Sequence, residues 1–150
     1  MKKVLLPVVM FLFCTAALFA QKKGGAAGRL VPYTVAKNYF VKNTFQQGML
    51  QSPKIESQET FDQYFGAAAF MGKDGKPTPI DFANQYVIVV IPPATDHSFK
   101  LSAKTLRQSG KTITLSYSYK LGKEQSSTSQ PCLVLVVDKK YKGTVKTVRA

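Results

Sequence analysis

The sequence predicts an α+β domain that is mostly β: a small antiparallel sandwich or open barrel of five to six strands with one helix. Two short, uninterrupted apolar runs, Tyr86–Ile91 and Cys132–Val137, are typical of strands that are buried on both faces. Between them, residues 113–119 alternate apolar and polar side chains, which predicts a half-buried strand. These three segments are expected to pair and to form the core.

The first residues, 1–20, are expected to be a signal peptide. Lys2 and Lys3 precede an apolar stretch, and small residues lead to a cleavage position after Ala20. The chain is therefore predicted to be exported, to the periplasm or out of the cell. A membrane anchor fits less well, because a span needs about 20 apolar residues. Attachment to a membrane would require a lipid on Cys14, and Phe13 is not the small residue that such sites carry.

Cleavage would leave a flexible Lys-, Gly- and Ala-rich tether, residues 21–29, followed by a single β-rich domain, residues 30–150. The formal charge is +13 before cleavage, so the mature chain stays strongly basic. Cys132 would be the only cysteine left, which excludes an intramolecular disulfide. Its place in an apolar run predicts an inert buried thiol, because a reactive thiolate needs exposure and nearby positive charge.

A first strand is expected within residues 37–43, and one helix is expected after it. Ser57 is a good N-cap, and Gly66 or Gly72 can end the helix. Between these limits, apolar residues recur at helical spacing: Phe61, Tyr64, Phe65 and Ala68. This stripe is expected to pack on the sheet.

The second half of the chain is expected to contain short strands joined by turns. Pro92–Asp96 is expected to be a rigid turn, and residues 99–104 alternate as a half-exposed strand. The Ser- and Thr-rich residues 122–130 are expected to form a long polar loop. Residues 138–143 are expected to be a hairpin connection to a last strand at residues 144–148.

We find no catalytic residue, no cofactor site and no metal-ligand set, so the chain is not expected to be an enzyme. His97 is the single histidine, between Asp96 and Ser98. Neighbouring side chains on an extended chain point in opposite directions, so these residues cannot form a catalytic relay among themselves. An exposed loop histidine is expected instead. One histidine and one buried cysteine cannot supply a usual zinc site.

The basic charge bears on the kind of partner. Lysines interleaved with tyrosines could bind single-stranded nucleic acid by phosphate contact and stacking. Export, the scarcity of arginine and the place of Tyr117 and Tyr119 on the presumed core side all argue against nucleic acid. A solvated basic surface that favours acidic partners is the expectation that remains.

Three segments in order carry a family resemblance: Ser57–Phe65, Ile80–Phe82 and Tyr86–Ile91. A short helix, an Asp-Phe step and a hydrophobic strand resemble the start of the C-terminal domain found in the protease-complex subunit PrcB family. The chain is also similar to small exported β-barrel protease inhibitors of Bacteroidetes-type bacteria. Pro92–His97 departs from the Gly-rich turn of the PrcB-like domains, so no functional residue is carried over. The resemblance implies a non-catalytic module that engages or restrains a protease.

Such a module could place an exposed segment along a protease cleft as an added strand. Residues 71–79, 92–98 and 122–130 are candidates, and the last is preferred because it is long, polar and uncharged from Gln125 onward. The candidate contacts are Gln125, Ser126, Ser127, Thr128 and Ser129. The alternative function is a structural or adhesive envelope protein that binds glycan or protein through a basic β surface.

Overall fold

The computed structural model of the protein describes residues 28–150. The predicted signal peptide and most of the predicted tether lie outside the described residues. Sheet A contains, in spatial order, β1 (Arg29–Leu30), β7 (Thr95–Ser109), β8 (Thr112–Ser129) and β10 (Thr144–Arg149). Sheet B contains β2 (Thr34–Val35), β9 (Leu133–Asp138), β6 (Gln85–Val90) and β4 (Lys54–Ile55). The remaining elements are α1 (Gln58–Tyr64) and the pair β3 (Tyr39–Val41) and β5 (Phe65–Ala67).

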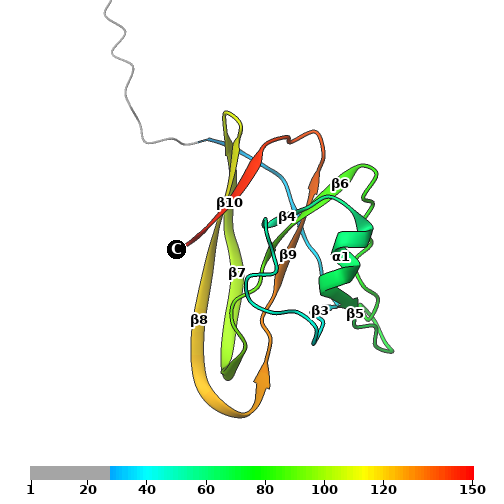
Figure 1. Ribbon diagram of the computed structural model, residues 1–150, viewed down its shortest axis with the longest axis vertical. Coiled ribbons are helices and arrows are strands. Elements are labelled where there is room, and N and C mark those ends of the chain that lie inside the picture. Colours follow the sequence, from blue (N-terminus) through cyan, green and yellow to red (C-terminus); the bar gives the residue numbers. More distant parts are fainter. Residues whose placement is uncertain (1–27) are drawn as a thin grey trace, which may run out of the picture.

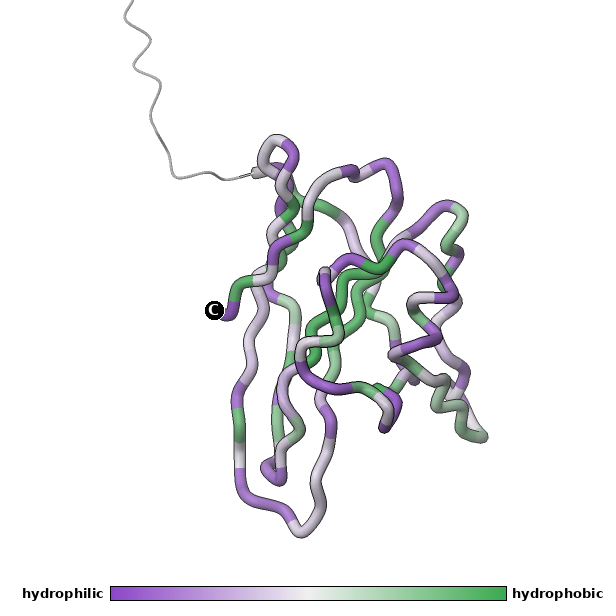
Figure 2. The backbone as a smooth tube through the Cα atoms, viewed as in Figure 1, coloured by the Kyte–Doolittle hydropathy of each residue, from purple (hydrophilic) through white to green (hydrophobic). Residues whose placement is uncertain are grey.

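Sheet B is the middle layer of the molecule, with sheet A on one side and α1 with β3 and β5 on the other (Figure 1). Alternate residues of β6 and β9 pack in two separate clusters. Those facing sheet A include Ile88 and Leu135, and those facing α1 include Val87 and Val136. The two predicted strands are therefore buried on both faces, and Figure 2 shows hydrophobic residues concentrated along them. The sandwich prediction is confirmed, and the sheets do not close into a barrel.

The helix begins where the sequence predicts and ends earlier. The side chain of Ser57 accepts a hydrogen bond from the backbone N–H of Thr60, which satisfies one of the free donors of the first turn. Phe61 is buried, and its ring stacks on Phe65 with centroids 4.7 Å apart. The prediction that Phe65 continues the helix is wrong, because Phe65 is extended and begins β5. Gly66 then lies beneath the ring of Phe40, where a Cβ would come within 2.5 Å.

Residues 122–130 are not a loop, contrary to the expectation from their polar composition. β8 continues to Ser129, which pairs with Thr95 at the start of β7. The predicted turn Pro92–Asp96 is correspondingly shorter, because β7 begins at Thr95. The composition misleads because this part of β8 is exposed on both faces, so no apolar alternation is needed to form the strand.

The predicted hairpin from Asp138 to the last strand is also wrong. β9 already has β6 along one edge and β2 against Leu135 and Val136 of the other, so a hairpin partner could not pair along the whole strand. The chain instead crosses to sheet A, where β10 pairs with β8 in parallel. This pairing buries Val145 beside Ile113. At the opposite edge of sheet A, Arg29 of β1 pairs with Gln108 of β7. The predicted tether therefore ends earlier than expected.

Candidate functional site

One part of sheet A extends beyond its neighbouring strands. β1 pairs with β7 only at Arg107 and Gln108, and β10 pairs with β8 only from Thr112 to Tyr117. Beyond these limits, residues 95–102 of β7 and residues 118–129 of β8 form a two-stranded segment, which we call the ribbon. Figure 1 shows the ribbon running past the end of β10, on the side of the molecule opposite α1.

The outer edge of β8 is open along most of the ribbon. The carbonyl of Tyr117 accepts a hydrogen bond from the backbone N–H of Ala150, at 2.7 Å, and the carbonyl of Tyr119 accepts one from the guanidinium of Arg149, at 2.6 Å. Backbone groups alternate between the two edges of a strand, so the N–H and C=O of Leu121 point to this same edge. Within the described part of the chain no strand lies beyond them. Such an edge is a template for another extended segment.

Beside this edge is a strip of exposed apolar side chains, formed by Phe99, Tyr119 and Leu121. Phe99 is 39% exposed and Leu121 is 53% exposed, and the two are directly opposite in register. The ring of Tyr119 lies 6.4 Å from that of Phe99. Farther along the ribbon the same row, through Leu101, packs on the core. The apolar strip is therefore a continuation of the core face that sheet B does not cover.

The predicted contact residues lie together at the free end of the ribbon. Residues 125–128 of β8 lie opposite the single residue Asp96 of β7, so they project as a wide bulge. Gln125, Ser126, Ser127 and Thr128 are exposed, and Ser129 is half-buried. Thr128 and Ser129 also line a surface depression of about 280 Å³. The sequence therefore locates this exposed end correctly while assigning it the wrong backbone conformation.

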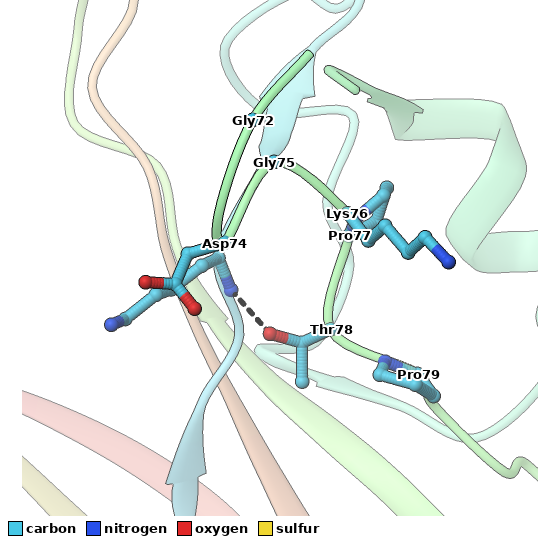
Figure 3. Close-up of a pocket in the computed structure, with 8 residues that line it drawn as sticks. Gly72, Asp74, Gly75, Lys76, Pro77, Thr78 and Pro79 are labelled. Atoms are coloured by element: carbon cyan, nitrogen blue, oxygen red, sulfur yellow. Dashed lines mark hydrogen bonds between the residues drawn. The ribbon is translucent and has the colours of Figure 1, made fainter. Parts of the chain in front are cut away.

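The second candidate segment, residues 71–79, is held in place by the two residues that precede β3 and lies apart from the ribbon. The side-chain amide of Asn38 donates to the carbonyls of Asp74 and Lys76, at 2.7 and 2.9 Å. The backbone N–H of Lys37 donates to the hydroxyl of Thr78 at 2.9 Å, beside an open pocket of about 550 Å³ (Figure 3). The third segment, residues 92–98, leads into β7, so its last residues belong to the ribbon.

His97 lies in β7 rather than in the expected loop, and it contacts its neighbour. Nδ1 of His97 is 2.7 Å from Oδ1 of Asp96. The expectation that adjacent side chains point apart is wrong here, because irregular pairing on both sides of His97 breaks the alternation. Among the described residues, no hydrogen bond joins the imidazole to a hydroxyl or a thiol.

Cys132 precedes β9 and is half-buried. Its Sγ lies 3.8 Å from the carbonyl oxygen of Tyr39, and burial raises the pKa of the thiol. The thiol is therefore protonated at neutral pH and is a poor nucleophile. In residues 28–150, no three His, Cys, Asp or Glu side chains are grouped so as to hold a metal ion. The described helix, α1, is too short and too polar to cross a membrane.

The apolar strip was not identified from the sequence, although a signal for it exists. Leu121 follows Ile113 and Leu115 in one alternating row, and this pattern places it on the core side. The pattern does not reveal that sheet B ends before Leu121 is reached. No protein-family model, no curated protein and no solved structure matches the chain. The case for a function therefore rests on the geometry of the ribbon.

Proposed function

We propose that this protein is an exported, non-catalytic binding module that adds an extended segment of a protein partner to the open edge of β8. The observation that carries the proposal is the coincidence of two features at Leu121. Its backbone groups are at an open sheet edge, and its side chain belongs to the apolar strip. Backbone pairing supplies affinity in strand addition, and apolar contacts at alternate residues supply specificity.

In its sharper form, the proposal is that the partner is a protease and that the protein inhibits it. Protease clefts bind extended polypeptide, so the edge of β8 can occupy the cleft as an added strand. The bulge at residues 125–128 projects from the same strand and is placed to make further contacts. The resemblance to protease-associated domains points in the same direction.

The charged residues near the open edge of β8 indicate which residues the partner segment carries. Lys120 and Lys123 flank Leu121 along β8, and Arg149 lies beside Tyr119 with its guanidinium 5.2 Å from the ring centre. A segment with an apolar residue directed at the strip and acidic residues on either side is complementary to this edge.

The test is an inhibition assay of the purified protein from Gln21 onward against serine, cysteine and metalloproteases. Leu121→Lys places a charge at the edge and removes the apolar contact, and we expect it to weaken inhibition about tenfold or more. Leu30→Lys is the matched control, because Leu30 is a comparably exposed leucine, 60% accessible, on β1. Stoichiometric inhibition lost only in Leu121→Lys supports the proposal. Equal inhibition by both variants, or no inhibition of any protease class by an intact protein, would refute it.

A further inference from the structure

Apart from the apolar strip, the outer face of sheet A is the large sheet surface that other elements leave uncovered among residues 28–150. Its inner face packs on sheet B, and both faces of sheet B are covered. Strand alternation directs the side chains opposite to the buried Leu106 and Leu115 toward solvent. The cations that the register places on this surface define what we call the basic face: Lys100, Arg107, Lys120 and Lys146.

The parts of the three strands that carry the basic face contain no acidic residue. Residues 98–109 of β7, 112–120 of β8 and 144–149 of β10 contain no Asp or Glu. In the described part of the chain, the ion pairs are Lys54 with Glu56 and His97 with Asp96, and none of these lies on the basic face. The charge of the face is therefore not neutralised from within the fold.

The cations of the basic face lie in two rows. Arg107, Thr114 and Lys146 are aligned across three strands, and Lys100 is directly opposite Lys120. Like charges in directly opposed positions destabilise a sheet, and an anion bound between them would remove the repulsion. From the row of Thr114 to Lys120 is six residues of β8, or about 20 Å. Arg107 and Lys146 are two strand spacings apart, about 10 Å.

Hydroxyl groups fill the space between the two rows of cations. They belong to Ser102, Thr105 and Ser116, each of which is exposed or half-buried. A surface of this kind offers separated positive charges and short donors spread over neighbouring strands. It is complementary to a polymer that carries repeated anionic groups along with hydroxyls of its own.

We propose that the basic face binds an anionic polysaccharide, carboxylated or sulfated, lying across β7, β8 and β10. Nucleic acid fits less well because Tyr117 and Tyr119 lie on the opposite face of β8, so the bases would have no ring to stack on. An acidic peptide gains most of its affinity at sheet edges rather than across a polar face. The two sites share Lys120 but lie on opposite faces of β8 and are tested by different assays, so either proposal can fail without the other.

The test measures binding of the protein from Gln21 onward to heparin and to polygalacturonate, by calorimetry at two salt concentrations. We expect the double substitution Lys120→Gln and Lys146→Gln to weaken binding roughly tenfold, because it removes two exposed charge contacts. The matched control is Lys73→Gln with Lys76→Gln, which removes the same charge from the exposed loop after β5. Unchanged thermal stability of both double variants shows that the comparison concerns binding.

Loss of affinity in the Lys120/Lys146 variant alone supports the proposal. The polymer that binds more tightly shows whether the preferred anionic group is sulfate or carboxylate. Equal loss in both double variants would show attraction by net charge alone and would overturn it. Poly(dT) or polyglutamate binding as tightly as the polysaccharides, with the same dependence on Lys120 and Lys146, would overturn it as well. Absence of binding to both polysaccharides at low salt would also reject it.

Discussion

The directly opposed pair Lys100 and Lys120 gives a sharp test of the basic face. Both side chains are exposed and on neighbouring strands in register. Lys100→Glu converts a repulsive pair into an attractive one without changing a buried residue. A position kept for binding is expected to carry a stability cost, so this substitution should make the protein more stable and a weaker binder of polyanions.

The size of the effect follows from the exposure of the pair. Opposite charges at directly paired positions contribute about 0.2–1 kcal/mol, and like charges cost a similar amount. We therefore expect a gain of about 0.5–1 kcal/mol in the free energy of unfolding at low salt. For a domain of this size, that gain raises the Tm by about 2–5 °C. Salt screens exposed charges, so most of the gain should disappear near 1 M salt.

Lys104→Glu is the matched control for this experiment. The pairing shifts between Ala103 and Thr105, so Lys104 has no residue opposite it. Its substitution changes the net charge equally but creates no cross-strand pair. Thermal unfolding followed by circular dichroism and polysaccharide binding are measured on both variants. Equal stabilisation of the Lys100→Glu and Lys104→Glu proteins would refute the repulsion between Lys100 and Lys120. A Lys100→Glu protein that is less stable than the unchanged protein at low salt would refute it as well.

Three further predictions concern the core, the end of the ribbon and the thiol. Burial, and then the charges of nearby carboxylates, raise the pKa of Tyr86 to about 12. The unfolded chain therefore loses the phenolic proton first, so stability should be complete below about pH 10 and fall as the pH rises toward 12. Tyr86→Phe should flatten this alkaline slope in denaturant titrations and, by removing the hydrogen bond to the carbonyl of Tyr141, cost about 1 kcal/mol at pH 7. Replacement of Ser126–Thr128 by glycines should abolish protease inhibition while leaving the circular dichroism spectrum intact; undiminished inhibition would discard the bulge as a contact. Cys132 should react with a disulfide reagent at pH 8 about tenfold more slowly, or slower still, in the native than in the denatured protein, and equal rates would contradict its burial.

The sequence by itself determined those strands and helix ends whose formation depends on residues close together in the chain. The runs in β6 and β9 predict strands buried on both faces, because a continuous apolar segment of this length is stable only when both sides are covered. Ser57 predicts the start of α1, because a cap acts on the N–H groups of the next turn. Polarity and length alone predict that residues 125–129 are a surface segment, and residues 125–128 are exposed at the end of the ribbon, while their role as contacts stays a prediction.

Tertiary structure decided the strand pairings and side-chain exposures that depend on which sheet edges and faces remain free. β9 has β6 along one edge and β2 against part of the other, so the last strand crosses to β8 and pairs in parallel. Phe65 leaves a helical pattern because β3 offers it a pairing partner. Leu121 carries the alternation of a core strand, yet it is exposed because sheet B ends before reaching it. The cations can be read from the sequence, but only the register between β7, β8 and β10 places four of them, Lys100, Arg107, Lys120 and Lys146, on one face. The apolar pattern predicts which side chains are stabilised by burial, and the packing of the assembled sheets determines which of them are buried.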